Sequence, residues 1–190
     1  SAGLNPKYSL IDTYHMTACA LDEAVRRIIA VGGSLDQIAL NDNFCWPSPI
    51  ASQNNPDAKY KMGQLVRANK ALYDYTLAFR TPCISGKDSM SLDGTVKDVN
   101  GAEHRISALP TIQFSAAGKI DDVGKCITMD VKTPGDLIYA VGMTYDELGA
   151  SEYYEMLGTL GNNMPKVDLQ KNLKTYKALE TAIQKELLAS

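Results

Sequence analysis

The sequence Leu35-Asp36-Gln37-Ile38-Ala39-Leu40-Asn41-Asp42-Asn43-Phe44-Cys45-Trp46-Pro47 places an apolar run directly before a cluster of polar side chains. Residues 35–40 predict a short buried strand that ends where the polar cluster begins. Ligand-binding side chains often lie at strand ends in α/β layers, so Asp42 and Asn43 are candidates for such a site. The alternative is an Asx-rich turn around a packed tryptophan.

A second junction of the same kind is Ser85-Gly86-Lys87-Asp88-Ser89-Met90, which follows a predicted strand at residues 83–85. A glycine lets the backbone approach a ligand, and a lysine offsets phosphate charge. Ser89 can donate a hydrogen bond to a phosphate oxygen, and Asp88 can hold a metal ion. The GxxxxGK spacing of a Walker loop is absent, and a simple polar turn is the alternative.

Outside these junctions, apolar periodicity predicts a helix over residues 13–31, ended by Gly32-Gly33, and a second helix over 57–80. No element is predicted before residue 12. Residues 92–103 predict an exposed turn or flap, and 111–119 and 126–131 predict strands. The buried stripe expected on the second helix is Met62, Leu65, Ala68, Leu72, Tyr75 and Phe79.

A new unit begins near residue 133, with a buried strand at 137–141, a short helix at 151–157 and a final helix from Asp168. The final strand has no later strand to pair with. The expected fold class is therefore α/β (α+β), with one domain at residues 1–132 and the start of a second, truncated domain at 133–190.

The net charge of −3 and a pI near 5.4, with Lys and Arg spread along the chain, give no footprint for nucleic acid or an anionic membrane. No apolar run is long enough to span a bilayer, so a cytoplasmic location is expected. The cysteines at 19, 45, 83 and 126 lack zinc spacing and are expected to be small buried hydrophobes. Neither histidine lies in a nucleophile setting, and no catalytic residue is assigned.

On the first helix, Asp22 and Glu23 precede Arg26 and Arg27 by one turn. Such acid-to-base pairs usually decorate a solvated helix face, and that is the expectation for both pairs.

Taken in order, these motifs resemble the second half of the formylglycinamide ribonucleotide amidotransferase family, within the aminoimidazole ribonucleotide synthetase-like superfamily. The matching stretches are Leu21 to Arg26, Asp42 to Trp46, Thr81 to Met90, and Gly135-Asp136 with Glu147-Leu148-Gly149 and Ser151 to Tyr154. The resemblance implies the later part of a nucleotide-binding domain, followed by an incomplete C-terminal α/β domain.

The resemblance also implies site residues and cofactors, namely ATP or ADP and Mg²⁺. Glu23 falls on a magnesium ligand, and Asp42 with Asn43 falls in or beside an ATP-contacting segment. Gly86 and Lys87 fall on nucleotide or phosphate positions, and Ser89 falls on a substrate contact. The sequence departs from the pattern of this family at two positions. Arg27 stands one turn after Glu23, where the family often has Asn, and Ala150 stands where the family usually has Gly.

The activity so implied is the ATP-dependent conversion of an amide to an amidine in purine biosynthesis, with ammonia taken from glutamine. The implied partners are a phosphorylated small-molecule substrate, the remainder of the synthetase and a glutaminase module. The piece alone is expected to lack turnover and to self-associate as a homo-oligomer. The alternatives are a non-catalytic half that retains a nucleotide and a related phosphotransferase of the same superfamily.

Overall fold

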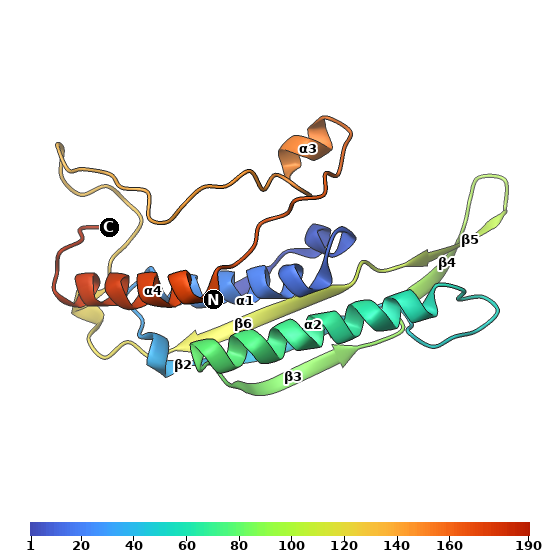
Figure 1. The fold of residues 1–190 in the computed structure, drawn as a ribbon, viewed down its shortest axis with the longest axis horizontal. Helices are drawn as coiled ribbons and strands as arrows, with labels where there is room; N and C mark the ends of the chain where they lie inside the picture. The colour runs from blue at the N-terminus through green and yellow to red at the C-terminus, as the bar shows by residue number, and fades with distance from the viewer.

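A four-stranded mixed sheet organises the chain, which a computed structural model describes over residues 1–190 (Figure 1). The strands lie in the order β1-β6-β2-β3. They are β1 (Ala2–Leu4), β2 (Ile38–Cys45), β3 (Cys83–Ser89) and β6 (Thr111–Gly118). β6 runs antiparallel to both β1 and β2, whereas β2 and β3 are parallel. β6 is therefore the strand that joins the N-terminal segment to the rest of the sheet.

Three long helices, α1 (Thr13–Ile29), α2 (Ala58–Phe79) and α4 (Leu169–Gln184), pack on one side of this sheet (Figure 1). Asp12 caps α1 by accepting from the backbone N–H groups of Tyr14 and His15. α1 ends just before Gly32, whose φ of +101° suits a glycine. Asp168 caps α4 in the same way. The predicted helices at 13–31, 57–80 and from Asp168 are confirmed.

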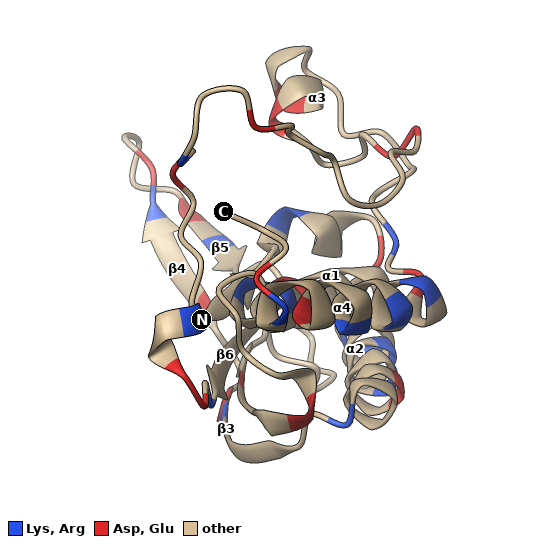
Figure 2. Cartoon of the chain, turned by 90° about the vertical axis from the view of Figure 1, so that its left-hand side faces the viewer, with Lys and Arg blue, Asp and Glu red and all other residues tan.

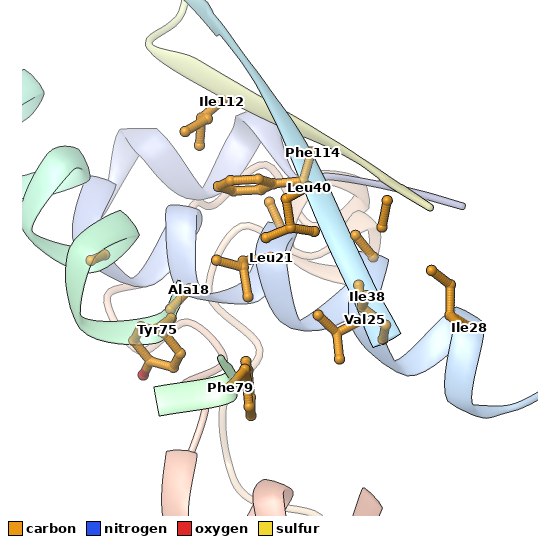
Figure 3. Close-up of a cluster of buried hydrophobic side chains, with 14 of the residues drawn as sticks. Ala18, Leu21, Val25, Ile28, Ile38, Leu40, Tyr75, Phe79, Ile112 and Phe114 are labelled. Carbon is orange, nitrogen blue, oxygen red and sulfur yellow. The ribbon is translucent and has the colours of Figure 1, made fainter. Parts of the chain in front are cut away.

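The core lies between the helices and one face of the sheet, because successive strand residues point to opposite faces (Figure 3). The buried strand residues of that face are Ile38, Leu40, Phe44, Ile112, Phe114 and Ala116. They meet the apolar stripe of α1 and the inner faces of α2 and α4. Of the stripe expected on α2, Ala68, Tyr75 and Phe79 are buried, whereas Met62 is 44% exposed because its side of the helix faces away from α1.

Residues 92–103 are not a simple turn but contribute to a separate two-stranded ribbon of β4 (Asp93–Lys97) and β5 (Glu103–Ser107). Asp93 holds the base of this ribbon by accepting from the backbone N–H of Ser48, 2.8 Å away, and from the hydroxyl of Ser107. Lys61, a buried cation on α2, donates to Ser107 Oγ at 3.4 Å on β5 and to Asn55 Oδ1 at 2.8 Å. The ribbon is thus anchored to the start of α2.

The chain between β6 and α4 is mostly irregular and contains only η3 (Val123–Lys125), a 3₁₀ turn, and the short helix α3 (Glu152–Met156). The helix predicted at 151–157 is confirmed, with Ser151 as its cap. The strands predicted at 126–131 and 137–141 are wrong. No neighbouring strand lies there to take their backbone hydrogen bonds, and Leu137 and Ile138 are 76% and 84% exposed.

Three further boundaries differ from the sequence prediction. β1 lies before residue 12, where no element was expected, preceding the 3₁₀ turn η1 (Pro6–Leu10). Residues 35–37 form the 3₁₀ turn η2 (Leu35–Gln37), and β2 starts only at Ile38. No helix of the chain combines the length and the apolar character that crossing a bilayer requires.

Candidate functional site

The two polar motifs lie side by side, because β2 and β3 are parallel neighbours. Asp42 pairs with Gly86 and Asn43 pairs with Lys87 in the strand register. The sequence prediction placed both motifs in loops at strand ends, and that placement is wrong, since both strands continue through them to Cys45 and Ser89. Polar residues can continue the strands here because one face of the sheet carries no helix layer and because β3 is an edge strand that is exposed along most of its length.

Strand alternation divides the predicted site residues between the two faces of the sheet. Asp42, Gly86 and Asp88 lie on the helix-facing side, in register with the buried Phe44 and Phe114. The three remaining site residues of the strands, Asn43, Lys87 and Ser89, lie on the opposite, uncovered side. One ligand on a single face therefore contacts only half of the set.

On the helix-facing side, Gly86 and Asp42 approach each other closely. A Cβ atom on Gly86 would lie 2.8 Å from Asp42 Oδ1 and 3.0 Å from Oδ2, closer than real contacts allow. Cys83 lies near the same carboxylate. Burial, followed by the charge and hydrogen bond of Asp42, raises the pKa of the Cys83 thiol to about 11. The raised pKa keeps this thiol mostly protonated at neutral pH.

On the uncovered side, Lys87 Nζ donates to Ser89 Oγ at 2.9 Å. Asn43 Oδ1, next to Lys87 in the register, is buried and has no hydrogen-bond partner. A buried acceptor without a partner costs free energy, so a bound donor would be favoured there.

A groove of about 830 Å³ separates the C-terminal half of α2 from the start of β3. Tyr73 and Leu77 supply apolar surface, Arg80 supplies a positive charge, and Cys83 connects the groove to Asp42. The size and the mixture of apolar wall with few polar groups are typical of small-molecule sites.

Glu23 lies far from this groove, on α1 beside β1. Two strands, β6 and β2, separate β1 from β3, so Glu23 and Asp88 stand roughly 14 Å or more apart and cannot share one metal ion. Nowhere does the chain gather three or more His, Cys, Asp or Glu side chains in a metal-binding group.

The surroundings of Glu23 do not fit a magnesium ion. Arg27 Nη2 lies 2.6 Å from Glu23 Oε1, while Oε2 accepts from Leu4 N at 3.2 Å and Asn5 Nδ2 at 3.1 Å. Both carboxylate oxygens are therefore taken by donors, and a cation already occupies the place of a metal. Asp42 and Asp88 fit better, since they lie on one face of adjacent strands and Mg²⁺ in nucleotide sites takes one or two carboxylates together with phosphates.

Asp22 was expected on a solvated face, and that prediction is wrong. It is 1% exposed and accepts from Arg26 Nη1 at 2.9 Å, Tyr176 OH at 2.6 Å and Asn172 Nδ2 at 2.8 Å. Burial, with the charge of Asp22, raises the pKa of Tyr176. Both partners on α4 lie 150 or more residues away in the sequence, which is why no local pattern revealed the network.

The four cysteines are all free, and the expectation that they are buried fails at Cys83, which is exposed as a residue although neighbouring groups partly enclose its thiol. The other three are half-buried.

Comparison with known proteins finds sequence similarity to relatives that share one name, PurL. No protein-family model matches it. It is 30% identical over 188 residues to phosphoribosylformylglycinamidine synthase subunit PurL of Methanocaldococcus jannaschii, covering 97% of the chain and 24% of the relative. It is 31% identical over 184 residues to the PurL subunit of Thermococcus sibiricus, covering 97% of the chain and 23% of the relative. The chain thus spans about a quarter of the length of these relatives.

Solved structures agree on the fold. Thermotoga maritima PurL complexed with FGAR matches with a TM-score of 0.58 and 11% identity, over 97% of this chain and 27% of that one. Thermotoga maritima PurL complexed with AMPPCP matches with a TM-score of 0.50 and 20% identity, over 67% of this chain and 18% of that one. The mixed α/β fold of the chain is therefore that of part of a PurL subunit.

Proposed function

We propose that this chain, which is related to PurL subunits over almost its whole length, is a segment of an ATP-dependent ligase that forms formylglycinamidine ribonucleotide in purine biosynthesis. The observation that carries the proposal is the similarity to PurL over 97% of the chain. A phosphorylated substrate, the remainder of the synthetase, a glutaminase module and a cytoplasmic location are parts of this proposal.

Within the segment, the helix-facing side of β2 and β3 takes the nucleotide and its metal ion. The Asp42 and Asp88 carboxylates would hold Mg²⁺, which neutralises phosphate charge when bound. Gly86 leaves room for the Asp42 carboxylate, and the groove beside Arg80 gives space for the nucleotide. The name of the Thermotoga maritima PurL complex with AMPPCP supports a nucleotide as the ligand of such a fold.

The uncovered side takes a second anionic group. Lys87 offers a positive charge and Ser89 a hydroxyl, while Asn43 Oδ1 needs a donor. This arrangement keeps Lys87 as a phosphate-contacting residue and Ser89 as a substrate contact, with Asn43 Oδ1 beside them to accept from a donor group of the ligand, but it assigns all three to the face opposite Asp42.

Calorimetric titration of the purified chain with ADP tests the nucleotide site. We expect a binding component that requires magnesium and that falls about tenfold or more in affinity in Asp88→Asn, because the substitution removes a negative ligand of the metal. Asp121→Asn is the matched control, since this exposed carboxylate pairs only with Lys119 at 2.6 Å. Loss of the component in both variants, or its absence in the unaltered chain, contradicts the site.

A similar pair of variants tests the second face. Lys87→Ala should weaken binding of a ribonucleotide monophosphate, and Lys97→Ala, which removes an exposed lysine from β4, should not. Equal effects would show that only overall charge matters.

A non-catalytic, nucleotide-retaining role is the second candidate function, and the Arg27 to Glu23 ion pair favours it. Replacing the matching quarter of a PurL subunit with this chain separates the two roles. Amidine formation by the hybrid supports a catalytic segment, whereas retained ADP without turnover supports the structural role.

A further inference from the structure

We propose that Arg27 occupies the place of a divalent ion at Glu23, and that the cavity between α1 and α4 binds the phosphate groups of a small molecule without a metal ion. This cavity lies apart from the β2–β3 groove. The inference rests on the proposed function only in taking the ligand to be phosphorylated.

Arg27 is held firmly in the metal's place. Its guanidinium contacts Glu23 Oε1 through Nη2 at 2.6 Å and donates through Nη1 to Ala2 O at 3.0 Å. Arg27 is also 58% exposed in its side chain, so its remaining N–H groups face outward. A guanidinium offers five donors in a planar fork that suits phosphate, and a partly used fork still has donors for a ligand.

The cavity beside it is large and positively charged. Its volume is about 1170 Å³, and its walls come from α1, α4 and the irregular segments at residues 141–148 and 165–168. Figure 2 shows basic positions along α4, with the long irregular segment that carries α3 running above α1 and α4. The lining contains five basic residues, Arg26, Arg27, Lys166, Lys171 and Lys174, and three acidic ones, Asp22, Glu147 and Asp168.

The three carboxylates of the cavity are already engaged within the protein. Asp22 accepts from two donors on α4 and from Arg26. Asp168 caps α4 through Lys171 N at 3.1 Å, and Glu147 accepts from Lys166 N at 3.2 Å. Arg26 and Lys171 are paired with Asp22 and Asp168, so Lys166 and Lys174 are the cations of the cavity that have no acidic partner and can meet an anion.

The size and the aromatic wall indicate a ligand as large as a nucleotide. Tyr8, Tyr145 and Tyr176 all line the cavity. Lys171 Nζ lies 5.9 Å from the Tyr145 ring centre and 3.3 Å from its hydroxyl, which places a charge beside an aromatic surface. A phosphate near Arg27 and Lys174 with a ring system against a tyrosine would use both features.

Two probes, inorganic pyrophosphate and ADP, test the inference by calorimetry in excess EDTA and again in magnesium. In EDTA, both should bind the unaltered chain. Arg27→Ala and Arg27→Asn should each reduce pyrophosphate affinity at least tenfold because both remove the guanidinium, and Lys174→Ala should reduce it about tenfold. Lys70→Ala is the matched control, because it removes the exposed cation of another i,i+4 ion pair, with Asp74 at 3.1 Å. A thermal melt of each variant checks that the fold persists, and Lys174→Ala keeps the test valid if Arg27→Ala unfolds.

Arg27→Asn gives the sharpest reading. It frees Glu23 and adds a neutral oxygen ligand, so pyrophosphate affinity should fall at least tenfold in EDTA, as in Arg27→Ala, but only Arg27→Asn should recover it in magnesium. The inference is overturned if the unaltered chain binds neither probe in EDTA, even when ADP binds in magnesium and the proposed nucleotide site stands. If pyrophosphate binds in EDTA while ADP shows no magnesium-dependent component, the nucleotide site fails and the inference stands.

Discussion

At the scale of single residues, Gly86 shows how one missing side chain shapes the candidate site. In Gly86→Ala the new Cβ would lie 2.8 Å from Asp42 Oδ1, so the carboxylate must turn away. We expect magnesium-dependent ADP affinity to fall about tenfold, with little loss of stability because only the end of a flexible side chain moves. Gly94→Ala on β4 is the control, since nothing lies within 4 Å of its added Cβ. An unchanged ADP affinity in Gly86→Ala would show that Asp42 does not contribute to ADP binding.

Ala150 shows the reverse case, because it carries a side chain at a backbone conformation that glycine adopts more easily. Its φ is +58°, in the left-handed region, and it is buried. This conformation costs a non-glycine residue about 1–2 kcal/mol, which exceeds the roughly 0.8 kcal/mol of its buried methyl group. Ala150→Gly should therefore raise the free energy of unfolding by about 0.5 kcal/mol in urea titrations. Ala178→Gly, in the interior of α4, should lower the free energy of unfolding by about 1 kcal/mol. If Ala150→Gly also lowers the free energy of unfolding, the backbone of Ala150 is not strained.

At the scale of elements, helices were predicted more accurately than strands, and the reason is local chemistry. The signals for α1 and α4 are local in sequence, since each helix has its cap, Asp12 or Asp168, directly before it and its apolar spacing within it. β2 and β3 depend on distant partners, and polar residues on their uncovered face, such as Asn43 and Lys87, look like loop residues in sequence. The composition of the candidate site was therefore predictable, whereas its division between two faces was not.

The junction of α1 and α2 provides a prediction about pH. Tyr14 OH donates to Asp74 Oδ2 at 2.8 Å, and this bond, followed by Lys70, lowers the pKa of Asp74. A lowered carboxyl pKa adds stability above the ordinary value near 4, and that stability is lost as the pH falls through the lowered value. Tyr14→Phe should cost about 0.5–1 kcal/mol between pH 5 and 7 and less below about pH 4, in urea unfolding across this range.

Tyr73→Phe is the matched control for that experiment, since Tyr73 lies on α2 next to Asp74 in the sequence and is 65% exposed. Its substitution should change the free energy of unfolding little at any of these pH values. A cost for Tyr14→Phe that stays constant down to pH 3 would mean that the Asp74 carboxylate is not involved.

At the scale of the whole molecule, α4 packs into the same core as α1, although turn signals in the sequence predict a domain boundary at residue 133 between them. Tyr176 belongs to the main hydrophobic cluster and binds Asp22. A boundary drawn from Thr133-Pro134-Gly135 reflects local turn signals, while the packing of α4 depends on contacts 150 residues away. The division into 1–132 and 133–190 remains a prediction.

Exposed apolar side chains predict self-association. Residues 137–143 include Leu137, Ile138 and Met143, which are 76%, 84% and 74% exposed. Contiguous apolar surface of this kind favours association. The mass from light scattering should rise with concentration, and Ile138→Ser with Met143→Ser should reduce the rise. Val99→Ser, a fully exposed site on the ribbon, is the control, and an unchanged rise in the double variant would place the contact elsewhere.

The order of the strands has a consequence for synthesis on the ribosome. β6, residues 111–118, bonds to both β1 and β2, so these strands have no antiparallel partner until more than a hundred residues have been translated. Until β6 has been made, α2 is the only long helix that can pack against the apolar stripe of α1, so the part of the stripe that packs on β6 stays exposed in the nascent chain. Slow, long-range pairing of this kind exposes a chain to aggregation, so expression at low temperature or with chaperones should increase the yield of folded protein.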